Sequence, residues 1–253
     1  RLADWIVSPD NPAFAAAMVN RLWKHFFAVG LVEPVDDLRA TNPPSNAPLL
    51  SALTEEFVRS GHDLRHIIRL LVGSRTYQLA SDTTDGNTND SRCHSHYYPR
   101  RLPAEVLADA IARATGVPDS FAGAPEGTRA IQLSSPQADS YFLTTFGRSE
   151  RVTACACERS GDVTLPQLLH LQNSEAILGK LRSESGSLAR LLGASGHGPA
   201  ELFEGLFLAT VSRMPDAEER AAIDAALVDG DRGEVAADLF WALLNSKEFT
   251  FNH

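Results

Sequence analysis

The segment RVTACACERSGD, residues 151–162, holds two of the three cysteines of the chain. Cys155 and Cys157 stand one residue apart and are followed by Glu158 and Arg159. Thiolates bind zinc and exchange disulfides, so this spacing suggests either a metal site or a redox pair. Zinc-binding cysteine pairs are usually spaced more widely, and further ligands would have to come from elsewhere in the chain. We therefore predict no metal site, with Cys155 and Cys157 as the weak candidates for one.

A simpler alternative is that this segment forms a short strand. Side chains alternate between the two faces of a strand, so Val152, Ala154 and Ala156 would face one way and the two cysteines the other. Cysteines are often buried as small core residues. The sequence leaves the zinc, redox and core alternatives open, and the segment remains a candidate binding site.

Arginines surround the two cysteines. Guanidinium groups bind carboxylates and sulfates through paired hydrogen bonds, so Arg148, Arg151 and Arg159 together could hold an anion such as a sugar acid. Pairing with Glu150 and Glu158 is the simpler interpretation, and exposed ion pairs of this kind add little stability. We favour ion pairing and retain the three arginines as candidate binding residues.

Another group of candidates lies on the first predicted helix. Apolar residues recur every three or four positions over residues 12–30, where a glycine predicts the end of the helix. Asn20, Arg21 and His25 fall on its polar side. His25 has the side chain best suited to act as an acid or base near neutral pH. A solvated face, or hydrogen bonds to the following loop with Asp36, is the simpler interpretation, and we prefer it.

The remaining pattern predicts a mainly α fold, an irregular helical bundle with a loop-rich middle segment. We expect helices over residues 10–116, loops over 117–164 with the strand-like pieces RAIQLSS and RVTACA, and helices again over 165–247. A connection as long as 117–164 usually takes part in binding. Residues 80–99 carry few aliphatic side chains and predict a surface loop. Further helices are predicted at residues 49–59, 63–72, 100–116, 165–182, 188–192, 199–212, 216–228 and 234–246.

Composition excludes some classes of partner and cofactor. The chain has 23 basic and 32 acidic side chains, a net charge of −9. Binding to nucleic acid requires Lys and Arg to neutralise phosphates, so we expect no nucleic-acid partner. No run reaches the ~20 apolar residues that span a bilayer, and we expect no membrane span in this chain. A C-x-x-C-H haem-attachment motif is missing. We therefore expect no cofactor in this chain, while the sequence leaves open whether it binds a metal ion.

Several segments, taken in order, resemble the bacterial domain of unknown function 1553, a family of planctomycete type. The resemblance covers essentially the whole chain, so we expect one unit of this family over residues 1–253. The segments that carry it are NPAFAAAMVNRLWKHFFAVGLVEPVDDLRATNPPS, SRTYQLAS, RRLPAEVLADAI, YFLTTFGRSERVTACACERSGDVTLPQLLHLQNSEAI, LFLATVSRMP and DLFWALLNSKEFTFNH.

The resemblance implies a setting rather than an activity. It implies that the chain is the C-terminal part of a longer exported protein, in the periplasm or at the cell surface. It also implies partner domains in that protein, among them a cytochrome c-type domain, and a link to electron transfer or polysaccharide breakdown. Two departures stand out. The His and Glu of the family's usual P-S-H-P-E-L-L are replaced here, with Asn46 in place of the His, and Ala156 replaces the Glu between the cysteines.

The function remains unknown from the sequence, and we expect a noncatalytic helical binding or assembly module of a larger exported bacterial protein. Such a module would contact a haem domain or an anionic glycan. The alternative is a hydrolytic or redox enzyme domain with a site around Cys155–Arg159. An enzyme requires that segment to converge with Asn20, Arg21 or His25 in one pocket, whereas a module requires only a complementary exposed surface.

Overall fold

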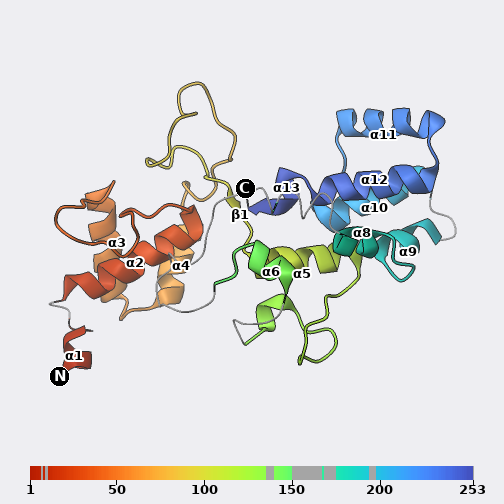
Figure 1. The fold of residues 1–253 in the computed structure, drawn as a ribbon. Coiled ribbons are helices and arrows are strands. Elements are labelled where there is room, and N and C mark those ends of the chain that lie inside the picture. The colour runs from red at the N-terminus through yellow and green to blue at the C-terminus, as the bar shows by residue number, and fades with distance from the viewer. Residues whose placement is uncertain are drawn as a thin grey trace. The chain divides into compact units, whose positions relative to one another are not determined.

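The computed structural model describes residues 1–6, 8, 11–134, 140–149, 167, 175–193 and 198–252. Across these residues the chain is mainly helical, as predicted, with one two-stranded sheet (Figure 1). The chain divides into two compact units, Arg1–Arg100 and Arg101–Asn252. The prediction of one family unit over residues 1–253 concerns family boundaries, which this division does not test.

The first unit is organised by capped, amphipathic helices. The side chain of Asn46 accepts a hydrogen bond from the N–H of Leu49 at 3.1 Å, and Asp63 accepts one from the N–H of Arg65 at 2.9 Å. Such caps satisfy N–H groups that have no partner inside the helix, which fixes where the helix starts. The helices are α1 (Leu2–Ile6), α2 (Pro12–Phe27), α3 (Ala47–Arg59) and α4 (Leu64–Val72).

One apolar face of α2 forms the centre of this unit. Trp23 and Phe27 stack with ring centroids 4.0 Å apart, and Val19 is fully buried on the same face. This is the three-and-four spacing that the sequence showed. The buried core of the unit consists of Ala15, Val19, Trp23, Phe27, Leu31, Val32, Leu50, Phe57, Ile67 and Leu71.

The end of α2 differs from the prediction. The helix stops at Phe27, and Ala28 adopts a left-handed backbone with φ 67°. Gly30 lies beyond the helix, where a Cβ atom would collide with the carbonyl oxygen of Val32. The prediction that Gly30 ends the helix is therefore wrong. Glycine is needed at this position because the backbone of the following loop passes too close for a side chain.

Residues 80–99 form no helix or strand, as predicted. The surface interpretation is wrong at their C-terminal end, because the side chains of His96, Tyr97 and Tyr98 are buried. The N–H of Tyr97 donates to the carbonyl oxygen of Ala80 at 2.9 Å, which closes the loop at its base. The polar tip is therefore exposed, while the end of the loop is buried.

The second unit is built around α5 and α12. It begins in β1 (Arg100–Arg101), at the boundary between the units, and ends in β2 (Phe251–Asn252), and these strands form the sheet. Helix α12 contacts α8, α9, α10, α11 and α13. The helices are α5 (Ala104–Thr115), α6 (Tyr141–Thr145), α8 (Glu175–Leu181), α9 (Ser187–Gly193), α10 (Pro199–Thr210), α11 (Ala217–Asp229), α12 (Arg232–Leu244) and α13 (Lys247–Thr250), with a 3-10 turn, η1, at Ala130–Gln132.

Aromatic and aliphatic side chains of three helices fill the core of this unit. Helix α5 contributes Leu107 and Ile111, α10 contributes Phe207, and α12 contributes Phe240 and Leu244. Each of these side chains is at most 2% exposed. Helices α10 and α12 lie next to each other, with α11 alongside α12 (Figure 1).

The predicted strand RAIQLSS is wrong. Its residues 130–132 form the turn η1, because the carboxylate of Asp109 accepts hydrogen bonds from the N–H groups of Ala130 at 2.7 Å and Ile131 at 3.3 Å. A strand would leave these N–H groups pointing to opposite sides. The other strand-like piece, RVTACA, lies outside the described residues. Of residues 165–174, only Gln167 is described, so the helix predicted at 165–182 is observed at Gln167 and in α8.

Candidate binding groove

Asn20, predicted on the polar side of α2, is fully buried. Its Nδ2 donates to the carbonyl oxygens of Val32 at 2.9 Å and Val35 at 2.8 Å, and its Oδ1 accepts from the N–H of Val32 at 3.0 Å. The amide therefore ties the loop after α2 back onto the helix. A solvated position for Asn20 is therefore wrong, while the alternative of a hydrogen bond from the helix to the following loop is confirmed. Loop backbone groups without water nearby draw the amide into the core.

Arg21 pairs with the following loop, as the simpler interpretation of the polar face predicted. Its Nε lies 2.6 Å from Oδ1 of Asp36, and the two side chains are 50% and 34% exposed. The hydrogen bond to Asp36 raises the pKa of Arg21 further above its usual value. At this exposure the pair contributes about 0–1 kcal/mol to stability. It orients the loop and supplies no acid or base near neutral pH.

His25 is exposed on α2, and its backbone carbonyl accepts a hydrogen bond from the guanidinium of Arg100. Its ring packs edge to face against Phe26 with centroids 4.9 Å apart. Partial desolvation by these neighbours lowers the pKa of His25, and the charge of Arg100 acts in the same direction. The ring is therefore neutral at neutral pH. It belongs to the first unit together with Asn20 and Arg21, whereas Arg148 belongs to the second.

Arg148 is buried, with 6% of its side chain exposed. Its Nε lies 3.6 Å from Oε1 of Glu105, and its Nη2 donates to the carbonyl oxygen of Leu133 at 3.2 Å. Its Nη1 is buried and finds no hydrogen-bond partner among the described residues. A buried donor without a partner costs about 1–3 kcal/mol, so within the described residues the guanidinium of Arg148 is incompletely satisfied.

The other sequence candidates, Arg151, Cys155, Cys157, Glu158 and Arg159, lie outside the described residues. Their zinc, redox and core alternatives therefore stay predictions. Within the part of the chain that the structure describes, no group of three or more His, Cys, Asp or Glu side chains is placed to hold a metal ion.

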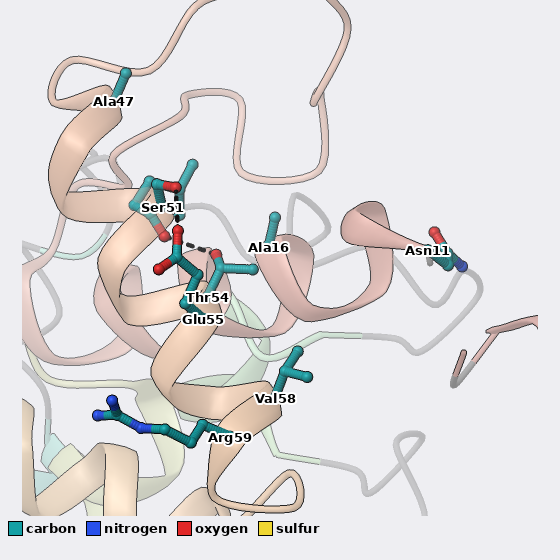
Figure 2. A pocket seen from close by; sticks show the side chains of 9 residues that line it. Asn11, Ala16, Ala47, Ser51, Thr54, Glu55, Val58 and Arg59 are labelled. Carbon is teal, nitrogen blue, oxygen red and sulfur yellow. Dashed lines mark hydrogen bonds between the residues drawn. The ribbon is translucent and has the colours of Figure 1, made fainter. Parts of the chain in front are cut away.

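A cavity of about 600 Å³ lies in the first unit between α2 and α3 (Figure 2). Small side chains such as Ala16 line much of it. Two of its polar groups bond along α3 itself, with Ser51 Oγ donating to Oε1 of Glu55 at 3.0 Å and Thr54 Oγ1 donating to the carbonyl oxygen of Leu50 at 2.6 Å. Arg59, the only cation among the described residues that line this cavity, pairs with Glu56 on the same helix.

A second cavity, of about 550 Å³, lies in the second unit between α5 and residues 116–131. We call it the α5 groove. It combines apolar side chains with four charged ones, all within the described residues. Its lining consists of Val106, Asp109, Ala110, Ala112, Arg113, Gly116, Pro118, Asp119, Gly127, Thr128, Arg129 and Ile131.

The wall opposite α5 is shaped by its glycines and by Asp109. Gly116 ends α5 in a left-handed conformation, φ 69°, and Gly127 has φ 78°. Left-handed backbone is readily adopted only by glycine among common residues. Asp109 then binds the N–H groups of η1, which holds the returning segment against α5. The groove therefore exists because a glycine-terminated helix is followed by a loop that a carboxylate pulls back onto it.

Both carboxylates of the groove are already engaged by protein groups. Asp109 accepts from two backbone N–H groups. Oδ1 of Asp119 lies 2.8 Å from Nζ of Lys180, which also donates to the carbonyl oxygen of Val117 at 2.7 Å. The Lys180 side chain is only 12% exposed. Asp119 and Lys180 also line a smaller cavity of about 290 Å³ beside α6 and α8.

The two guanidinium groups of the groove are much less engaged. Arg129 has 64% of its side chain exposed, and its Nε lies 3.9 Å from Oδ2 of Asp109, at the limit of an ion pair. Arg113 is exposed, and no described side chain forms an ion pair or hydrogen bond with its guanidinium. The groove thus offers planar cationic donors above an apolar lining, a combination that suits an anionic ligand.

The chain matches one known protein family. A family model described as a protein of unknown function (DUF1553) matches residues 1–227. The chain belongs to this family. No curated protein and no solved structure matches it. The DUF1553 match includes the α5 groove and ends within α11.

The arginines of this DUF1553 groove were missed by sequence reasoning. Asp109 and Arg113 stand four positions apart and share a face of α5, which was a detectable signal. Arg129 follows sixteen positions later in a loop, and nothing local connects it with Arg113.

Across the described residues, every helix of the chain is too short or too polar to cross a lipid bilayer.

Proposed function

We propose that this DUF1553 chain is a noncatalytic helical binding module whose ligand lies in the α5 groove. The observation that carries this proposal is the unequal engagement of the groove's charges. Asp109 and Asp119 are held by protein groups, whereas Arg113 and Arg129 retain donors for a ligand. An anionic occupant is complementary to this pattern.

The occupant we propose is an acidic glycan, a polysaccharide with carboxylates along its length. A guanidinium binds a carboxylate through two parallel hydrogen bonds, which favours Arg over Lys at such a site. Exposed pairs contribute only about 0–1 kcal/mol each. Binding therefore has to come from repeated weak contacts along a polymer, whose local concentration is high once one sugar is bound.

The behaviour of the α2 residues supports a module. Asn20 holds a loop, and Arg21 forms an exposed pair with that loop. These side chains, which the sequence offered for chemistry, act in the fold of the first unit. A complementary groove without a convergent acid, base and nucleophile is what binding alone requires.

Calorimetric titration of the chain with oligogalacturonate tests the proposal, with dextran of similar length as the neutral comparison. We expect binding of oligogalacturonate that weakens with salt, and none of dextran. Arg113→Ala/Arg129→Ala should reduce affinity about tenfold, the sum of two exposed pairs. The matched control is Arg65→Ala/Arg69→Ala on α4, which removes the same charge away from the groove. Equal loss in both double variants, or equal binding of dextran, contradicts the proposal.

The alternative function, a hydrolytic or redox enzyme domain with a site around Cys155–Arg159, is favoured by one observation. The buried Nη1 of Arg148 lacks a hydrogen-bond partner among the described residues, and Arg148 precedes that segment closely in sequence. A Cys155→Ser/Cys157→Ser variant tests this alternative. Loss of a stoichiometric metal, or of a reactive low-pKa thiol in alkylation kinetics, would support it, and an unchanged protein would refute it.

The setting that we propose follows from the family resemblance. The chain would act within a larger exported protein, outside the cytoplasm, next to a cytochrome c-type domain. Fractionation of cells that produce the full-length protein tests the location, and absorbance of covalently bound haem in the same purified protein tests the partner domain. If the protein contains haem but cross-linking finds no contact between the haem domain and this chain, the proposed haem-domain contact is contradicted. The glycan proposal does not depend on that result.

A further inference from the structure

The loop from Ala80 to Tyr97, termed the 80–97 loop, makes a contact with α2 that the proposed function does not use. The loop is folded by its own bonds. Its base is closed between Tyr97 and Ala80, and the carboxylate of Asp90 accepts hydrogen bonds from three of the N–H groups that follow it, at 2.7 to 3.0 Å. These bonds shape the loop, but they do not attach it to the helix.

His94 attaches the 80–97 loop to α2. The indole N–H of Trp23 donates to Nε2 of His94 at 3.2 Å, and the two rings meet edge to face with centroids 5.3 Å apart. Phe27 lies against the same imidazole at 5.9 Å. An indole N–H can only donate, so Nε2 carries no proton in this contact. The imidazole is therefore neutral, with its proton on Nδ1.

The groups around His94 disfavour a charge on it. From α2, Trp23 and Phe27 face the ring, and both are uncharged and at most 4% exposed. The hydroxyl of Tyr98, directly after the loop, accepts the backbone N–H of His94 at 2.8 Å, and from the loop the Asp90 carboxylate lies nearby. Burial lowers the pKa of His94, and the charge of Asp90 opposes this more weakly.

We propose that His94 is a proton-sensitive latch, which holds the 80–97 loop on α2 when neutral and releases it when protonated. Protonation adds one proton from solvent to Nε2. The hydrogen bond from Trp23 is then lost, and two N–H donors face each other. The positive ring would also remain against the buried rings of Trp23 and Phe27, partly shielded from water, which is unfavourable for a charge. Release of the loop exposes the indole of Trp23.

The pH at which the latch opens follows from these contacts. The closed loop favours neutral His94, so it binds a proton more weakly than the open loop does. The latch is at full strength above the ordinary histidine pKa of about 6.5 and weakens as pH falls toward the lower pKa of the closed state. Each pKa unit between the two states changes the closed-to-open ratio about tenfold.

Fluorescence of Trp23 tests the latch. Trp5→Phe/Trp241→Phe leaves Trp23 as the only tryptophan of the chain. On acidification from about pH 8 to about pH 4, we expect its emission to move to longer wavelength, with a midpoint below about 6.5. His94→Gln keeps an acceptor for the indole and removes the titrating ring, so this change should vanish. His25→Gln removes another histidine with a lowered pKa and should leave the transition in place.

Hydrogen exchange separates release of the loop from unfolding of the unit. At the acidic end, amides of residues 80–97 should lose protection, after correction for intrinsic rates, while those of α2 keep it. An emission that does not change with pH, or a His94→Gln chain with the transition of the parent, overturns the proposal. If the double tryptophan replacement does not fold, exchange in the natural chain and in His94→Gln decides the question.

Discussion

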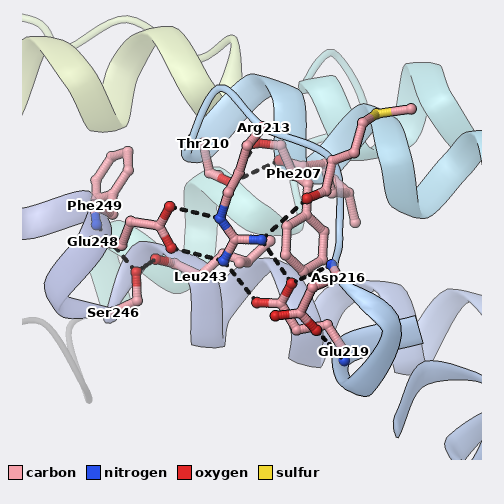
Figure 3. Close-up of polar contacts among 11 residues, drawn as sticks. Phe207, Thr210, Arg213, Asp216, Glu219, Leu243, Ser246, Glu248 and Phe249 are labelled. Carbon is pink, nitrogen blue, oxygen red and sulfur yellow. Dashed lines mark hydrogen bonds and ion pairs between the residues drawn. The ribbon is translucent and has the colours of Figure 1, made fainter. Parts of the chain in front are cut away.

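Asn20 in the first unit and Arg213 in the second each hold separate segments together, by opposite physical means. Asn20 is a neutral amide with no exposed surface, bonded to backbone groups of Val32 and Val35. Arg213 is a cation with 38% of its side chain exposed. It binds the carboxylates of Glu219 and Glu248, each through two hydrogen bonds of 2.7 to 2.8 Å (Figure 3).

The surroundings of the two residues differ in the same way. The loop bonded to Asn20 has little access to water, so each bond that is lost leaves a backbone group unsatisfied. Arg213 lies over the ring of Phe207 at 5.4 Å and joins the end of α10 to α11 and α13. Water and salt reach its partners, which weakens their mutual attraction. The comparison teaches that burial, more than charge, decides how much a polar contact contributes to stability.

The largest expected effect is that of Asn20→Ala. It leaves the N–H of Val32 and two carbonyl oxygens without partners inside the core. We expect a loss of about 2–5 kcal/mol in the free energy of unfolding, measured by urea denaturation followed by circular dichroism. Arg21→Ala, at the next position, removes only an exposed pair and should cost no more than about 1 kcal/mol. Equal effects of the two variants would contradict the structural role assigned to Asn20.

A smaller loss is expected for Arg213→Ala, about 1–3 kcal/mol, because Glu219 and Glu248 keep contact with water. The difference from the natural chain should shrink in ~1 M NaCl, where charges are screened within about 3 Å. Arg213→Lys keeps the positive charge but lacks the planar guanidinium. Its free energy of unfolding should therefore lie between those of the natural chain and Arg213→Ala. The loss for Asn20→Ala should not change with salt. If the loss of stability in Arg213→Ala does not change with salt, the predicted difference between the Asn20 and Arg213 sites is contradicted.

The smallest expected effect is a pH dependence at Glu219. Its hydrogen bonds from Arg213, and less so from the N–H of Asp216, lower its pKa against the opposing effect of burial. A lowered pKa stabilises the folded chain above the ordinary glutamate value of about 4.3, and this contribution is lost as pH falls through the lower folded value. Urea denaturation at several pH values should show this loss in the natural chain, and less of it in Glu219→Gln. Identical pH profiles of the natural chain and Glu219→Gln would show that the Glu219 carboxylate does not contribute to the pH dependence of stability.

Most helices were readable from the sequence, but two predictions were wrong. Helix α6 (Tyr141–Thr145) lies within residues 117–164, which were predicted as loops, and Arg100–Arg101 form β1 where a helix was predicted to begin. The start of α4 and the end of α5 were predicted at Asp63 and Gly116, and both positions act as predicted in the structure. Caps and apolar periodicity are local signals, since they involve residues within one or two turns. The end of α2 was misplaced because it depends on the approach of the loop near Gly30, a contact that no local pattern encodes.

The candidate sites were much less readable. Asn20 was placed on a polar face because its neighbours along the helix are polar, yet it is bonded to residues twelve and fifteen positions away. Arg113 and Arg129 were not predicted as binding residues, because one stands on a helix and the other in a loop, and the two segments meet only in the fold. His94 was assigned to a surface loop, and its contact with Trp23 spans 71 positions.

By itself, the sequence of this DUF1553 chain determined its helical class, its charge and its resemblance to the family. The helical class and the charge follow from composition and from patterns that repeat over a few residues, and the resemblance follows from the order of several matching segments. Only the tertiary structure decided which polar side chains support the fold and which remain available to a ligand. The physical reason is that a hydrogen bond or ion pair needs both partners in place. For Asn20, Asp109 and His94 the partner comes from a separate segment of the chain.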